Sequence, residues 1–279
     1  MMDDRLRRAG RPLGLLALIA ALAACGGDAD LNLENTAPEV IYQRAEAELA
    51  SGDADDAAVL FAEVERLYPY SEFAKRGLIM QAFAYHQDRD YENARLAAQR
   101  YIDFYPADED AAYAQYLLAL SYYDQIDQVG RDQGLTFQAL RNLRTVIERY
   151  PDSEYARSSI LKFDLAFDHL AAKEMEIGRF YLKRGHYPAA INRFRAVVEE
   201  FQTTTHTPEA LMRLVEAYMA LGLMQEAQTA GAILGHNFQG SPFYDDAFRQ
   251  LNGQGLAPEA AGTGWLRSVY DRTVRGRWL

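Results

Sequence analysis

One side chain in this sequence has the chemistry and the setting for a covalent modification. Cys25 is the sole cysteine among 279 residues, so no intrachain disulfide can form and the thiol needs another role. It closes the run Leu-Ala-Ala-Cys at residues 22–25, in which small residues let a peptidase approach the backbone. This arrangement predicts that cleavage leaves Cys25 as the first residue and that its sulfur accepts a lipid.

The residues before Cys25 have the organisation of a secretory leader. A basic stretch from Arg5 to Arg11 precedes 12 apolar residues from Leu13 to Ala24. As a helix this run is about 18 Å long, against roughly 30 Å for a hydrocarbon core, so it is too short to span stably. We therefore predict a signal peptide over residues 1–24 whose end is similar to the bacterial lipobox. An ordinary signal peptide with a chance cysteine is the alternative.

The stretch that follows Cys25 is small and polar, with the sequence Gly-Gly-Asp-Ala-Asp at residues 26–30. We expect residues 25–36 to form a lipidated cysteine and a flexible tether. A single acyl chain binds a membrane only marginally, so stable anchoring requires more than one. The covalent lipid on Cys25 is the only non-protein group that we expect, with no cofactor and no metal.

The remaining reactive side chains form no recognisable catalytic or metal-binding pattern. The histidines show no i, i+4 pairing and no cysteine partner: His86, His169, His186, His206 and His236. The acidic run at residues 53–56 lacks the glycine and the final glutamate of an EF-hand loop. Without the leader the chain carries 25 basic against 38 acidic residues, a net charge of −13 that repels nucleic acid. We predict neither an enzyme nor a nucleic-acid-binding protein.

A repeat organises the rest of the chain. A small residue, a second residue four positions later and a proline eight further on recur in three copies, and two weaker copies follow. The copies begin at Ala57, Ala94, Ala139, Ala190 and Ala227. Small residues let two antiparallel helices approach closely, and proline ends the second helix. The pattern resembles the tetratricopeptide repeat, in which helix pairs stack because one pair cannot bury its own apolar stripe.

We therefore predict an all-α tetratricopeptide-repeat superhelix of about five helix pairs over residues 37–251. The expected helices cover residues 38–51, 54–68, 71–87, 91–104, 108–126, 135–149, 153–184, 187–201, 207–221 and 224–236. Residues 127–134 are an insertion in the third repeat. The stretch 153–184 has no internal breaker, which indicates one extended helix between the front and back repeats.

The C-terminal segment has a different composition. Residues 252–264 are rich in Gly, Ala and Pro and are predicted to be a linker, and residues 265–279 form a basic amphipathic tail. Leu266, Tyr270 and Val274 fall on one helical face of this tail. Docking on protein, binding to anionic lipid and disorder are the three alternatives. We favour docking, because two tryptophans supply apolar area.

Several motifs together resemble the BamD family, the lipoprotein subunits of the outer-membrane β-barrel assembly machinery. The resemblance covers about residues 12–240. It is carried by the lipobox, the five repeats and four short motifs: Ala-Pro-Glu-Val-Ile-Tyr at 37–42, Leu-Tyr-Pro-Tyr-Ser at 67–71, Gly-Arg-Asp-Gln at 130–133 and Arg-Tyr-Pro-Asp-Ser-Glu-Tyr at 149–155. Ala-Ile-Asn-Arg at 190–193 also matches, whereas the Arg-rich tail departs from the family.

The resemblance implies a partner and a place. Members are lipid-anchored on the periplasmic face of the outer membrane, bind the POTRA domains of the insertase BamA, and work with other Bam subunits. Arg193, with Asn192 beside it, matches the position that contacts a POTRA domain, and an arginine fork suits carboxylates. A solvated side chain or a local ion pair is the alternative for Arg193. Another periplasmic repeat adaptor, linked to peptidoglycan or the cell envelope, is the alternative function.

Members also recognise the C-terminal signals of unfolded β-barrel clients, which are extended and end in aromatic and apolar residues. First helices of a tetratricopeptide array line its concave face, so an aromatic groove could accept such signals. The candidates are Tyr42, Glu46, Ile79, Phe83, Tyr113, Tyr116 and Tyr123, together with Tyr68 in the front region. For each of them the alternative is a place in the core between repeats.

Overall fold

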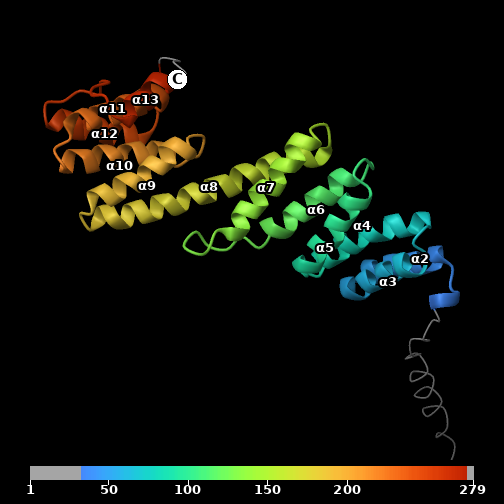
Figure 1. Cartoon of the computed structure of the whole chain (residues 1–279). Helices are drawn as coiled ribbons and strands as arrows, with labels where there is room; N and C mark the ends of the chain where they lie inside the picture. The colour runs from blue at the N-terminus through green and yellow to red at the C-terminus, as the bar shows by residue number, and fades with distance from the viewer. Residues whose placement is uncertain (1–32, 275–279) are drawn as a thin grey trace, which may run out of the picture. The chain divides into compact units, whose positions relative to one another are not determined.

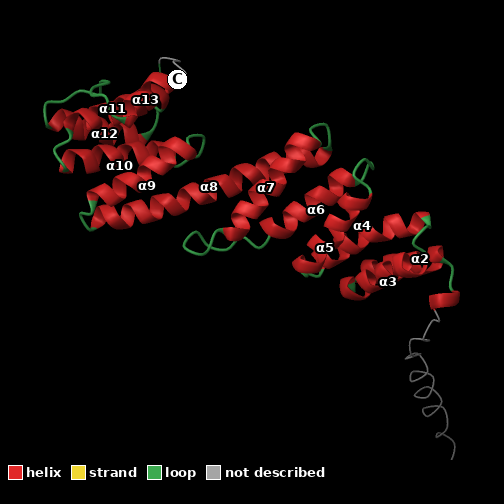
Figure 2. Cartoon of the chain, viewed as in Figure 1, coloured by secondary structure: helices red, strands yellow, loops and turns green. Residues whose placement is uncertain are grey.

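The computed structural model describes residues 33–274, and every regular element in that range is a helix (Figure 2). The leader, Cys25 and Trp278 lie outside the described residues. Contacts divide the chain into two compact units, residues 1–77 and 78–279, and each unit is described by itself. Within residues 33–274, no helix combines the length and the apolar character needed to cross a bilayer.

The first unit contains a short 3₁₀ helix, η1 (Leu33–Asn35), and one complete helix pair (Figure 1). The pair consists of α2 (Pro38–Ser51) and α3 (Ala54–Leu67), and the unit ends within α4 (Glu72–Gln87). Ala45 and Ala57 are fully buried, as is the ring of Phe61 four residues after Ala57. The small residues of the repeat therefore sit in the core, as the pattern predicts.

The second unit consists of further helices that follow one another along the chain (Figure 1). Its elements are α5 (Tyr91–Phe104), α6 (Ala111–Tyr123), α7 (Gly134–Arg149), α8 (Glu154–Lys183), α9 (Tyr187–Glu200), α10 (Thr207–Ala220), α11 (Met224–Asn237), α12 (Pro242–Gly253) and α13 (Trp265–Thr273). From α5 to α11, each helix packs against the next. The all-α fold of five helix pairs is thus confirmed.

Four of the five turns inside the pairs share one backbone conformation. Gly52, Gly185 and Gly222 have φ of 101°, 73° and 75°, in the left-handed region that glycine adopts without strain. Arg89 takes the equivalent place in the second pair with φ of 65°. These are the four turns that the sequence pattern places between first and second helices.

Helix α8 is the extended helix expected between the front and back repeats, with 30 residues. Ser153 caps its N-terminus, because the Ser153 side-chain oxygen accepts a hydrogen bond from the backbone N–H of Ala156 at 3.2 Å. Helix α8 packs against α7 and α9 and also contacts α6. The insertion before α7 is held to α8, since Lys173 Nζ on α8 donates to the backbone oxygen of Arg131 at 2.5 Å.

The C-terminal end of the second unit adds two helices and a helix-free segment to the last repeat, and the described part of the tail docks on protein. Helix α12 was not predicted, and it packs on α10 and α11. The helix-free segment 254–264 lies on α11, where Thr229 Oγ1 donates to the Ala261 oxygen at 2.7 Å. Helix α13 also packs on α11, burying Leu266 and Val269.

Candidate partner and client surfaces

Tyr42 belongs mainly to the core of the first unit. It is 4% exposed, and its ring meets Phe61 edge-on with centroids 5.3 Å apart and Phe73 at 5.6 Å. The Arg76 guanidinium lies 4.9 Å from the ring centroid. Burial raises the pKa of the Tyr42 hydroxyl, and the nearby Arg76 offsets part of that rise. The hydroxyl also interacts with the exposed Glu46, so Glu46 and Arg76 are the groups that a ligand would meet here.

Tyr68 fastens the start of the described chain to the end of α3. Its hydroxyl donates to the backbone oxygen of Thr36 at 2.7 Å and lies 3.4 Å from that of Glu34. The side chain is half-buried. This geometry gives Tyr68 a structural role and leaves part of its ring accessible.

Three tyrosines of the second unit form one cluster. The ring of Tyr155, at the start of α8, lies 5.1 Å from Tyr113 and 5.4 Å from Tyr116, both on α6. The Tyr116 hydroxyl is hydrogen-bonded to Ser158 Oγ at 2.7 Å. Burial, with smaller contributions from Tyr155, Tyr116 and Asp110, raises the pKa of Tyr113 to about 12. The sequence analysis selected Tyr113 and Tyr116 but did not include Tyr155.

The other predicted client residues of this unit differ in exposure. Ile79 is 6% exposed and is part of the apolar core made by α4, α5 and α6. Phe83 is half-buried and packs against the same core. Tyr123, at the far end of α6, packs on the core of the later helices, and its ring centroid lies 5.4 Å from the ammonium of Lys162. Phe83, Tyr113, Tyr116 and Tyr123 are half-buried and therefore remain the accessible candidates of this unit.

Arg193, the predicted partner contact, is on α9 and is held in a local ion pair. Its Nη1 lies 3.0 Å from Oε2 of Glu174 on α8, and the Arg193 side chain is 44% exposed. Asn192 beside it is exposed. An ion pair at this exposure contributes little to stability, and it orients the guanidinium while leaving part of the fork open to a partner.

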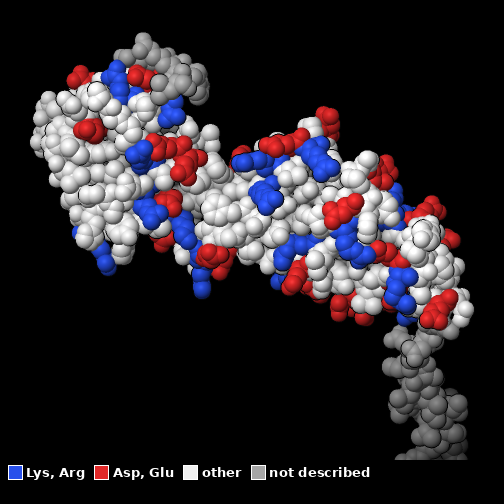
Figure 3. Space-filling view, in the orientation of Figure 1, with Lys and Arg blue, Asp and Glu red and all other residues white. Residues whose placement is uncertain are grey.

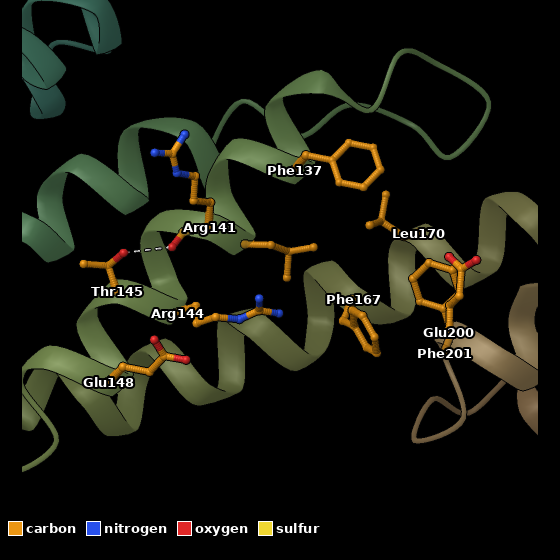
Figure 4. A pocket seen from close by; sticks show the side chains of 10 residues that line it. Phe137, Arg141, Arg144, Thr145, Glu148, Phe167, Leu170, Glu200 and Phe201 are labelled. Atoms are coloured by element: carbon orange, nitrogen blue, oxygen red, sulfur yellow. Dashed lines mark hydrogen bonds between the residues drawn. The ribbon is translucent and has the colours of Figure 1, made fainter. Parts of the chain in front are cut away.

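A cavity that the sequence analysis missed lies between α7, α8 and the end of α9 (Figure 4). Its volume is about 430 Å³. The lining residues are Phe137, Leu140, Arg141, Arg144, Thr145, Glu148, Phe167, Leu170, Glu200 and Phe201. The spacing of Phe137, Arg141 and Arg144 along α7 is the signal that could have indicated it, since all three lie off the stripe that faces the core.

Charged side chains of both signs lie on the face of the described residues that is visible in Figure 3. On the face of the second unit that Figure 3 shows, acidic and basic side chains are interspersed. Within residues 33–274, no group of histidines, cysteines and acidic residues could hold a metal ion. The described structure is that of a helical-repeat protein that presents surfaces, and comparison with known proteins identifies its family.

The sequence family described as an outer membrane lipoprotein, YfiO, matches residues 34–233, which is more than half of the chain. A relative from Caulobacter vibrioides, named outer membrane protein assembly factor BamD, is 46% identical and covers 95% of this chain and 90% of its own length. The protein of that name from Rickettsia prowazekii is 41% identical over 84% of this chain and 94% of its own. The chain therefore belongs to the BamD family of outer membrane protein assembly factors.

Among solved structures, a thermophilic tetratricopeptide-repeat protein from Thermus thermophilus is similar to this chain. It is 19% identical, with a TM-score of 0.36, and the match covers 79% of this chain and all of that one.

Proposed function

We propose that this protein is a scaffold of outer membrane protein assembly that binds a POTRA domain of the insertase BamA through α9. Family membership supports the process, and the half-exposed guanidinium of Arg193 supports the place. Glu174 holds that guanidinium next to the exposed Asn192. A carboxylate of the partner would take the free side of the fork, and other Bam subunits would join the same complex.

The proposal includes recognition of the C-terminal signals of unfolded β-barrel clients. In the second unit, Tyr113, Tyr116 and Tyr155 place three phenol rings together, and Phe83 packs against the same core as Tyr113. Rings of this kind accept apolar and aromatic side chains of an extended segment by burial and edge contacts. In the first unit, Glu46 and Arg76 around Tyr42 supply polar groups for the same kind of ligand.

We also propose that acyl chains on Cys25 hold the protein on the periplasmic face of the outer membrane. The sequence pattern around residues 22–25 supports this anchor. Cys25→Ser should give an unprocessed or soluble protein, and mass spectrometry of the mature N-terminus tests it. Cleavage at another residue with an unmodified thiol would refute the anchor.

Co-purification from detergent-solubilised envelope tests the partner. BamA should be recovered in a stoichiometric amount with the parent chain and in a reduced amount with Arg193→Gln. Glu174→Gln removes the same ion pair while keeping the guanidinium, so it should retain BamA. Equal loss in both variants would mean that the ion pair acts on the fold and that Arg193 makes no direct contact.

A control and an alternative outcome complete this test. Arg249, on α12, is 72% exposed and pairs with Asp246 within its own helix, so Arg249→Gln should leave the recovery of BamA unchanged. Recovery of peptidoglycan-linked or division proteins in place of BamA would favour a different periplasmic adaptor. The two outcomes are read from the same mass-spectrometry experiment.

A further inference from the structure

The cavity between α7 and α8 has an aromatic wall. Phe167 and Phe201 have ring centroids 4.9 Å apart, and Phe163 stacks on Phe167 at 5.8 Å with an angle of 21°. Phe137, which is 60% exposed, stands at the α7 side (Figure 4). An exposed phenylalanine beside buried apolar side chains leaves apolar area that a ligand can cover.

Two arginines of α7 line the same cavity. The Arg144 guanidinium lies 5.4 Å from the Phe163 ring centroid, and Figure 4 shows Arg144 reaching toward Phe167. Both arginine side chains are exposed. Within residues 33–274, neither Arg141 nor Arg144 takes part in an ion pair, so both guanidiniums are available to a ligand. Two guanidiniums next to an apolar cavity can bind a carboxylate with charge-assisted hydrogen bonds.

Two acidic side chains at the cavity further restrict the kind of ligand that it can bind. Glu148 and Glu200 also line the cavity, so the arginines are balanced by two carboxylates and a bare anion gains little. An extended peptide end carries both kinds of group, because its terminal carboxylate suits arginine and its backbone N–H groups suit glutamate. The volume of about 430 Å³ lies within the usual range for ligand sites and accepts an aromatic side chain.

We infer that this cavity binds the C-terminal residue of an extended peptide that ends in an aromatic side chain with a free carboxylate. The ring enters between Phe137, Phe167 and Phe201, and the carboxylate pairs with Arg141 and Arg144. This inference rests on the proposed recognition of client C-termini and assigns the terminal residue to a place separate from the tyrosine cluster. The tyrosine cluster is then left to bind the preceding residues.

Fluorescence anisotropy with the mature chain tests the inference. The probe is a synthetic extended peptide, labelled at its N-terminus and ending in Phe with a free carboxylate. Matched peptides carry a C-terminal amide or end in Ala. We expect the amide and the Ala peptide each to bind about tenfold more weakly, the effect of losing a charge-assisted pair or a buried ring. Equal binding of the amide would overturn the inference, because the ligand would then be an internal segment.

Variants of the cavity arginines test whether the peptide carboxylate binds at this cavity. Arg141→Gln/Arg144→Gln should weaken the free-acid peptide about tenfold and leave the amide nearly unchanged. Arg157→Gln, at an exposed arginine of α8 outside the cavity, is the matched control. All three side chains are exposed, so the variants should fold like the parent.

A crosslinking measurement separates the two proposals. With benzoylphenylalanine as the last residue of the peptide, crosslinks should map to residues 137–148 or 167–201. Crosslinks elsewhere, with unchanged binding by the arginine variant, would refute the cavity while leaving client recognition intact. If none of the peptides binds the parent chain, the proposed recognition of client C-termini fails together with this inference.

Discussion

Gly178 on α8 provides the sharpest test of how the helix pairs are held together. A Cβ added there would lie 2.4 Å from Cε1 of Phe194 on α9, and 2.8 and 2.9 Å from two other ring atoms. Ordinary contact begins near 3.4 Å, so the ring must shift by about 1 Å. Phe194 is fully buried and has little room to move. Overpacking of this kind costs about 1–3 kcal/mol, partly offset by the roughly 1 kcal/mol that Ala gains over Gly in a helix.

We therefore expect Gly178→Ala to lower stability by up to about 2 kcal/mol, where each 1.4 kcal/mol changes an opening equilibrium tenfold. Hydrogen exchange of peptides from α8 and α9 measures this locally, which matters because helical repeats can open in parts. Gly253→Ala is the control, since nothing lies within 4 Å of its added Cβ. It should be neutral or slightly stabilising.

A double-mutant cycle then shows whether the close contact is the cause. Phe194→Leu removes the ring atoms that the new methyl group meets, so adding Gly178→Ala to it should cost at least about 1 kcal/mol less than in the parent. If the two changes are additive, or if Gly178→Ala protects α8 as much as Gly253→Ala protects α12, the packing argument is wrong.

Three further outcomes follow from the described contacts. Arg89→Gly should raise the free energy of unfolding by about 0.5–1 kcal/mol in urea denaturation, because Arg89 has a positive φ; a loss of stability would contradict this. Because burial raises the pKa of Tyr113 to about 12, the stability it contributes is complete below pH 10 and is lost as pH rises toward 12. Tyr113→Phe should flatten that alkaline decline in unfolding curves. Trp265→Phe removes the bond from Nε1 to the Tyr218 hydroxyl at 2.9 Å and should increase protease cleavage after residue 254, at a cost of about 1 kcal/mol.

The helix pairs could be predicted from the sequence because their signals are local. A small residue, a second residue four positions later and a proline lie within one repeat, and Gly52 and Gly185 stand in the gaps between the expected helices. Helix α12 carries similar signals, since Ser241 caps it and Pro242 begins it. It was missed because the repeat count ended before it.

The candidate surfaces were harder to predict, because a helical period does not show which apolar residues a neighbouring helix covers. Tyr42 lies on a first helix as expected, yet Phe61 and Phe73 surround its ring. The cavity beside Phe137 needs a wall from Phe201, which is 64 residues later, so only packing brings the two together.

The end of the chain illustrates why composition alone is a weak guide to a terminal segment. A stack of helix pairs leaves an apolar face on its last helix, and that face must be covered. An added Cβ at Gly231 would lie 2.7 Å from Leu251 of α12, so glycine permits the close approach that seals this face. Helix α13 adds Leu266 and the ring of Trp265, over which the Arg195 guanidinium lies at 4.9 Å. A truncation that removes these helices therefore uncovers the core of the last repeat, and any loss of partner binding that it causes has to be separated from that exposure.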